Sequence, residues 1–240
     1  MPEVVYIDEP FKLTAKDFPL KKIYVLDKWL CTELHHWFDE WVSQRGIWSK
    51  TNQVNSTSPT GLPHHSLWGA SFFRSDYKVE HDVLPSDTYF IKFLSRRLET
   101  EFGFMWSRFQ YAGMNSQTMG QQGTTHADCD KDDEWNLSFL YYPNRFWNPH
   151  WGGVLRLYDD SYQQGIDGRE DHIKNHQIAE VEFKPNRLLM FDGRIPHGAD
   201  APDPKARYID RRSLVIRGDE VRLPETKEYF YAYDRVHNSQ

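Results

Sequence analysis

Apolar residues recur at helical spacing in two segments of the first hundred residues. The first segment carries large apolar side chains three or four positions apart, at Leu26, Leu30, Leu34, Trp37, Phe38 and Trp41. Side chains at this spacing line one face of a helix, so the pattern predicts an amphipathic helix over 26–44. A second helix is predicted to follow Ser86, because serine favours the N-cap position. Its expected buried face comprises Phe90, Ile91, Leu94, Leu98 and Phe102.

The segment between these helices, 46–85, has a different composition. It is rich in Ser, Thr, Asn, Pro and Gly, yet it carries the aromatic residues Trp68, Phe72, Phe73 and Tyr77. A long polar loop with aromatic anchors is typical of a lid or a substrate-binding segment, although such loops also serve as plain connections. Both interpretations stay open from the sequence.

Beyond residue 103 the chain changes to short apolar runs separated by turn residues. The runs are 139–142, 154–158, 181–183, 188–191 and 213–216. Several strands of this length predict a mainly β fold of the sandwich or jelly-roll type. Because the helices precede the strands, we expect them to pack on one outer face of the sheets.

The length of 240 residues is consistent with one domain. We expect an N-terminal helical and loop region over 1–102, a β core over 103–220 and a C-terminal extension over 221–240. The aromatic share of 15% suits a β-rich core and an aromatic-lined cleft.

Charge and cysteine content narrow the class of protein. The net charge of −6 disfavours nucleic acid as a partner, because duplex binders present a surplus of Lys and Arg. Two cysteines are too few for a disulfide framework, which indicates a reducing compartment. The N-terminus lacks the features of a signal peptide, and no run approaches the ~20 apolar residues of a membrane span. A soluble, cytoplasmic protein is therefore expected.

Three residues have the chemistry of a metal site. His126 and Asp128 are two positions apart, so on a strand both point to one face, although alone they would be read as a surface ion pair. His197 follows the apolar run 188–191, where a strand end can aim it inward. Two imidazoles and one carboxylate form the facial triad of non-haem iron oxygenases, with three positions left open. The same ligands would hold Zn(II), Ni(II) or Mn(II), and zinc with a bound water is the main alternative.

The segment 211–217 supplies a second feature. A 2-oxo diacid such as 2-oxoglutarate chelates a metal at one end and carries a distal carboxylate, whose burial requires a cationic partner. Arginine binds a carboxylate bidentately and stays charged. On a strand, Arg211 and Ser213 share one face and could bind that carboxylate together, while Arg212 would point outward as a solvated residue. The alternative is that both arginines are surface charges on an edge strand.

Three segments resemble the prolyl-hydroxylase branch of the Fe(II)- and 2-oxoglutarate-dependent oxygenases. They are 135–144 (WNLSFLYYPN), 152–157 (GGVLRL) and 183–191 (FKPNRLLMF). The resemblance covers about 103–218 and does not extend to the N-terminal hundred residues. It implies a double-stranded β-helix, a jelly-roll variant. It also implies that His126, Asp128 and His197 bind iron and that Arg211 anchors the distal carboxylate of 2-oxoglutarate.

The resemblance also suggests roles for neighbouring residues. Tyr142 matches the position whose hydroxyl helps to bind the distal carboxylate, unless it is simply a tyrosine buried in a strand. Asn115 and Gln117 lie on the expected neighbouring strand and would either hydrogen-bond the cosubstrate or close a turn. An intact Asp128 favours hydroxylation, because in related halogenases a small residue replaces this carboxylate.

The sequence departs from the pattern of the branch in two places. The gap from His197 to Arg211 is longer than usual, which leaves Arg207 and Arg212 as lesser candidates for the anchor. Arg217 stands where the branch often has an aromatic residue near the substrate, so the identity of the substrate is in doubt.

The resemblance implies an enzyme that uses Fe(II), 2-oxoglutarate and dioxygen, with ascorbate as a candidate reductant and with succinate and carbon dioxide as coproducts. The favoured substrate is a prolyl residue of a peptide or protein. One alternative is a nucleic-acid dealkylase, because Arg211 and Arg217 are six positions apart and Asn115 precedes His126 by eleven. Hydroxylation of an amino acid or small molecule is another. A non-catalytic metal-binding jelly-roll module is the alternative from a different class.

Overall fold

A computed structural model describes residues 3–44, 48–53, 66–74, 85–123, 125–129, 131–159 and 176–224. Its largest element is an eight-stranded sheet in the order β1-β2-β9-β6-β11-β5-β4-β3, in which only the β1–β2 pair is parallel. The strands are β1 (Glu3–Ile7), β2 (Lys22–Asp27), β3 (Ser49–Gln53), β4 (Ser66–Arg74), β5 (Met105–Gln117), β6 (Leu137–Tyr141), β9 (Arg187–Phe191) and β11 (Arg211–Arg222). A second, antiparallel sheet has the order β10-β7-β8 and contains β7 (Leu155–Tyr158), β8 (Gln177–Val181) and β10 (His197–Ala199).

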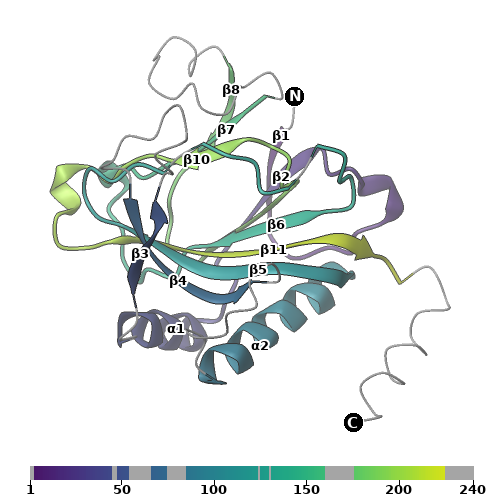
Figure 1. Ribbon diagram of the computed structural model, residues 1–240, viewed down its shortest axis with the longest axis horizontal. Helices are drawn as coiled ribbons and strands as arrows, with labels where there is room; N and C mark the ends of the chain where they lie inside the picture. Colours follow the sequence, from purple (N-terminus) through teal and green to yellow (C-terminus); the bar gives the residue numbers. More distant parts are fainter. Residues whose placement is uncertain are drawn as a thin grey trace.

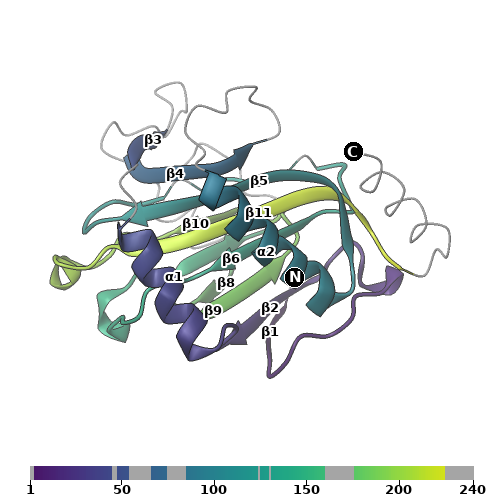
Figure 2. The same cartoon turned by 90° about the horizontal axis from the view of Figure 1, so that it is seen from below.

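Two long helices, α1 (Thr32–Gln44) and α2 (Pro85–Phe102), cover one face of the large sheet (Figure 1; Figure 2). The small sheet lies against the other face (Figure 1). Short 3-10 helices occur at Ala15–Asp17, Pro149–Trp151 and Pro204–Ala206. This is the mainly β jelly-roll architecture that the sequence predicts, with the helices on one outer face as expected.

The large sheet is buried on both faces, and β9 shows how its sequence meets that requirement. Leu188 and Met190 join the core beneath the helices, whereas Leu189 and Phe191 join the core between the two sheets. Side chains alternate across a strand, so a strand buried on both faces needs an uninterrupted apolar run. The run 188–191 is therefore a strand of the sheet centre.

The predicted helix over 26–44 is wrong at its start, because α1 begins at Thr32. Leu26 belongs to β2, where it pairs with Leu188, and Lys28 turns the chain with a φ of 57°. The Leu30 amide donates to Oδ1 of Asn186 at 3.0 Å. Leu26 and Leu30 are buried in the same core as the apolar face of α1. Their spacing is therefore compatible with a helix although neither residue is helical. Hydrogen bonding to β9 makes the segment around Leu26 a strand.

The second helix is confirmed, and its five predicted core residues are all buried. It begins at Pro85, so Ser86 lies in the first turn rather than before it. The loop interpretation of 46–85 is wrong for β3 and β4, which extend the large sheet by pairing with each other and with β5. Phe72 on β4 is buried in the core. Tyr77 and the question of a lid lie outside the described residues.

The strand predicted at 181–183 lies earlier in the chain, at Gln177–Val181. β8 ends at Val181, and the following turn is held by Arg187, whose Nη1 donates to the carbonyl of Glu182 at 2.8 Å. Phe183 packs in the core between the sheets without being part of a strand. β11 extends to Arg222, two residues past the predicted end of the core, and the rest of 221–240 after residue 224 lies outside the described part.

Cys31 and Cys129 are both free thiols. In the part of the chain that the structure describes, neither helix is long and apolar enough to cross a membrane.

Candidate functional site

The three predicted metal ligands come together at one end of the small sheet. One ligand atom from each of His126, Asp128 and His197 lies within 4.8 Å of the other two. Nε2 of His126 is 3.6 Å from Oδ1 of Asp128, and Nε2 of His197 is 3.7 Å from Oδ2. His126 and His197 exchange backbone hydrogen bonds of 3.0 and 2.9 Å, so an antiparallel bridge brings the distant segments together.

The hydrogen bonds and burial of the triad favour the protonation states that bind a metal. Nδ1 of His197 lies 2.9 Å from the carbonyl of Ile195, so a proton on Nδ1 is donated there and the lone pair of Nε2 faces the site. Burial lowers the pKa of His197 to about 4, which keeps the imidazole neutral near pH 7. Burial alone would raise the pKa of Asp128, but His197, His126 and Arg217 together lower it. A neutral imidazole and an ionised carboxylate are the ligand forms.

The Asp128 carboxylate is held from both sides. Ser138 on β6 donates from its Oγ to Oδ2 at 2.7 Å, and Arg217 on β11 donates from Nη1 to Oδ1. The Asp128 amide donates to the carbonyl of Gly193 at 2.7 Å. The sequence did not predict the contact of Arg217, although its even spacing from Arg211 places both on one face of β11.

The polar residues predicted on β5 and β11 share the inner face of the large sheet. Arg211 pairs with Gln117 and Ser213 pairs with Asn115 in the register of the two strands. Directly paired residues point to the same face, so all four face the small sheet. Arg212 alternates to the opposite face, as the sequence predicts, but the expectation that it is solvated is wrong, because its side chain is 16% exposed and its Nη2 lies 2.9 Å from Oδ1 of Asp39 on α1.

The guanidinium of Arg211 is fully enclosed. Nε donates to the carbonyl of Gly153 at 2.8 Å and Nη1 donates to Oε1 of Gln117 at 2.9 Å. Cζ lies 5.0 Å from the ring centroid of Tyr142 and 4.8 Å from that of Phe183. Among the described residues, no carboxylate forms an ion pair with Arg211. Burial accordingly lowers the pKa of this guanidinium.

Gln117 performs one of the two tasks considered for it, the closing of a turn, and the other end of its side-chain amide contacts Arg211. Its Oε1 orients Arg211, and its Nε2 donates to the carbonyl of Gln121 at 2.9 Å, which closes the turn after β5. The Tyr142 hydroxyl is buried and makes no hydrogen bond with any described residue. Of the lesser candidates for the anchor, Arg207 is exposed and stacks on the exposed ring of Tyr208.

A bound anion would complete this arrangement. A buried guanidinium without a carboxylate and a buried hydroxyl without a partner each lack an interaction that proteins normally supply. One carboxylate placed between Arg211 and Tyr142 would accept hydrogen bonds from both. The residues present therefore fit the distal carboxylate of 2-oxoglutarate.

Residues 109–216 match the family model of the 2OG-Fe(II) oxygenase superfamily. No curated protein is similar enough in sequence to match the chain. Among solved structures, a prolyl hydroxylase from Trichoplax adhaerens, in complex with a hypoxia inducible factor oxygen degradation domain peptide fragment, is 18% identical with a TM-score of 0.51. That match covers 91% of this chain and 87% of the other.

An oxidoreductase of the 2OG-Fe(II) oxygenase family from Burkholderia pseudomallei is 12% identical, with a TM-score of 0.53 and coverage of 83% of this chain and 84% of that one. At these identities the solved structures show a shared fold. The family match implies Fe(II), 2-oxoglutarate and dioxygen, and His126, Asp128 and His197 could bind the metal. The chain therefore carries a domain of the 2OG-Fe(II) oxygenase superfamily and is a 2-oxoglutarate- and Fe(II)-dependent dioxygenase.

Proposed function

We propose that this oxygenase hydroxylates an unactivated C–H bond of a prolyl residue in a peptide or protein. The observation that carries the catalytic part is the pair of incomplete sites: a His-Asp-His cluster and a buried Arg211 without a carboxylate. A chelating diacid has one group for each.

His126, Asp128 and His197 would hold Fe(II), while Arg211, Tyr142 and Ser213 would hold the distal carboxylate of 2-oxoglutarate. When bound, Fe(II) and 2-oxoglutarate supply the oxidising chemistry with dioxygen and release succinate and carbon dioxide. The protein's own contribution is to bind, orient and exclude water. The rings of Tyr142 and Phe183 beside the guanidinium keep this end of the site dry and so strengthen its attraction for an anion.

One observation supports the choice of substrate, and a second supports hydroxylation as the reaction. The similar structure from Trichoplax adhaerens is a prolyl hydroxylase that holds a peptide. The triad carboxylate is present as Asp128, in the place that halide takes in related halogenases, which favours hydroxylation.

A second candidate, dealkylation of nucleic acid, is favoured by one observation. Arg217, rather than an aromatic residue, contacts the triad carboxylate, and it shares the inner face of β11 with Arg211. The net charge of −6 disfavours this candidate.

The metal and cosubstrate assignments can be tested together by anaerobic titration of the apoprotein with Fe(II) and 2-oxoglutarate, followed by the visible charge-transfer band. We expect the band in the wild type, its loss in Asp128→Ala and a shift to much higher 2-oxoglutarate concentration in Arg211→Ala. Arg207→Ala, which removes an exposed arginine, is the matched control and should behave as wild type. A folded, metal-loaded protein without the band would contradict the proposal and favour a zinc site or a binding module.

The substrate can be tested by succinate release in the presence of prolyl peptides, methylated oligonucleotides and free amino acids. Stimulation by prolyl peptides with formation of hydroxyproline would support the proposal. Stimulation by methylated oligonucleotides alone would replace it with the dealkylase.

A further inference from the structure

A cavity of about 570 Å³ lies on the helix side of the large sheet, and none of the residues in the triad or around Arg211 lines it. Its wall is built from α1, the residues after it, β4, β5, the loop after β6 and the segment leading into β11. Its lining residues include two arginines, two aspartates and four aromatic residues. A cavity of this size accommodates a small ligand or a large side chain.

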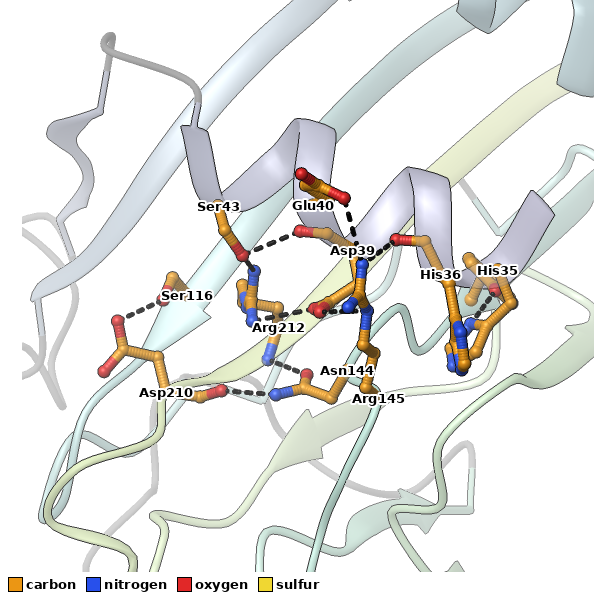
Figure 3. Close-up of polar contacts among 11 residues, drawn as sticks. His35, His36, Asp39, Glu40, Ser43, Ser116, Asn144, Arg145, Asp210 and Arg212 are labelled. Carbon is orange, nitrogen blue, oxygen red and sulfur yellow. Dashed lines mark hydrogen bonds and ion pairs between the residues drawn. The ribbon is translucent and has the colours of Figure 1, made fainter. Parts of the chain in front are cut away.

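Both arginines of the wall are already matched by acids (Figure 3). Nε of Arg145 lies 3.2 Å from Oδ2 of Asp39, and its Nη2 lies 3.4 Å from Oε2 of Glu40. Nη2 of Arg212 lies 2.9 Å from Oδ1 of Asp39. Glu40 does not line the cavity, but together with Asp39 it occupies both guanidinium groups, so neither arginine is free to attract an anionic ligand.

Asp210 is the second acid among the lining residues, and it is exposed. Its Oδ2 accepts a hydrogen bond of 3.2 Å from Oγ of Ser116, and no cation in the described part of the chain pairs with it. Its backbone is clamped by the buried amide of Asn144, which donates to the Asp210 carbonyl at 2.7 Å and accepts from the Arg212 amide at 3.0 Å (Figure 3). The carboxylate is thus presented to the cavity from a fixed segment.

Aromatic rings make up much of the remaining wall, from Trp48, Trp68, Phe146 and Tyr208. The faces of aromatic rings attract cations, and the attraction is strongest for a cation that sheds water easily. Asp210 would repel an anion, and a neutral ligand would gain no attraction from its charge. An organic cation would be attracted both by the faces of the rings and by the charge of the carboxylate.

We propose that this cavity binds an organic cation, an alkylammonium group, held between Asp210 and the aromatic wall. The site is separate from the catalytic cluster, and the sheet lies between them: Arg211 points to the inner face, whereas Asp210 and Arg212, its neighbours in sequence, line the cavity. The proposal does not depend on the proposed reaction.

Isothermal titration calorimetry of the metal-free full chain tests the proposal with two probes of one shape. Choline carries the charge, and 3,3-dimethylbutan-1-ol is its neutral isostere. We expect choline to bind at least tenfold more tightly than the isostere. Asp210→Asn keeps an acceptor for Ser116 but removes the charge, and should weaken choline at least tenfold while leaving the isostere unchanged.

Two further variants complete the experiment. Glu182→Gln removes the same charge from an exposed position outside the cavity and should not change choline binding. Phe146→Leu, at an exposed ring where folding is not at risk, should weaken choline because one aromatic face is lost. Absence of choline binding at millimolar concentration, equal binding of the two probes, or indifference to Asp210→Asn would each overturn the proposal. Because the titration needs neither iron nor 2-oxoglutarate, its failure is distinguishable from failure of the proposed reaction.

Discussion

Arg217 donates from Nη1 to Oδ1 of Asp128, while Ser138 donates to the other carboxylate oxygen. Each oxygen of the triad carboxylate therefore has one donor, so the plane of the carboxylate is fixed between His126 and His197. The guanidinium is itself held, because its Cζ lies 5.3 Å from the ring centroid of Tyr111. Groups behind a metal ligand orient it and tune its affinity for the metal.

Replacing Arg217 by Met should weaken Fe(II) binding about 10- to 100-fold, the usual cost of losing such a partner of a ligand. The affinity for 2-oxoglutarate at saturating Fe(II) should change little, since Arg211 is untouched. Anaerobic Fe(II) titration measures the first quantity. Arg222→Met, at an exposed position on the same strand, is the control, and an equal loss in both variants would mean that Arg217 contributes only to general charge.

Substitution of two neighbouring glycines tests whether the position of the Arg211 side chain matters for cosubstrate binding. Both have positive φ, 64° at Gly152 and 74° at Gly153, so alanine strains the backbone at either position. A Cβ at Gly153 would lie 2.9 Å from Cδ of Arg211, whereas at Gly152 the nearest atom is 3.7 Å away. We expect Gly153→Ala to raise the 2-oxoglutarate concentration needed for half-saturation by about tenfold or more, equivalent to ~1.4 kcal/mol.

Gly152→Ala should lower stability to a similar extent and leave this concentration near the wild-type value. Thermal unfolding and the 2-oxoglutarate dependence of the charge-transfer band, measured on both variants, give the two quantities. Similar 2-oxoglutarate affinities in the two variants would show that the position of Arg211 is not critical.

Gln117 offers a test of charge at the anchor. Gln117→Glu would place a carboxylate against Nη1 of Arg211, where it competes with the distal carboxylate of the cosubstrate. Gln117→Leu removes one hydrogen bond without adding a competing charge. We therefore expect Gln117→Glu to weaken 2-oxoglutarate binding by about tenfold or more relative to Gln117→Leu. The opposite order, measured by the same titration, would argue against a carboxylate at Arg211.

Acid should destabilise the metal-free protein through His197. Its pKa of about 4 in the folded state lies below the ordinary value of 6.5, so between these values the unfolded chain binds a proton that the folded chain excludes. The stability contribution is complete above pH 6.5 and is lost as the pH falls toward 4. Lowering the pH from 7.5 to 5.5 should cost about 1 kcal/mol from this group.

Urea unfolding of chelator-treated protein at the two pH values measures this effect against His197→Gln, in which it should disappear. A pH dependence as steep in the variant as in the wild type would assign the acid sensitivity to other groups.

The sequence by itself determined the features that depend on local periodicity. The even spacing of Arg211 and Ser213 placed both on one face of a strand, and the helical spacing over 90–102 located the buried face of α2. The single alanine between His126 and Asp128 indicated a pair of ligands. The first two features lie within one strand and one helix, whose geometry follows from a few neighbouring residues. His126 and Asp128 lie outside the named strands, at an isolated bridge and the bend after it, so for them the sequence indicated the types of ligand and not a strand.

Only the tertiary structure decided the features that depend on which segments pair. Leu26 has a spacing that fits a helix, but pairing with Leu188 makes it part of β2. Trp68 lies in a polar segment that becomes an additional strand against β5. Arg217 reaches Asp128, and Asp210 faces a ring-lined cavity, because strands far apart in the sequence lie side by side. Such contacts are set by long-range hydrogen bonding and burial, which no short stretch of sequence specifies.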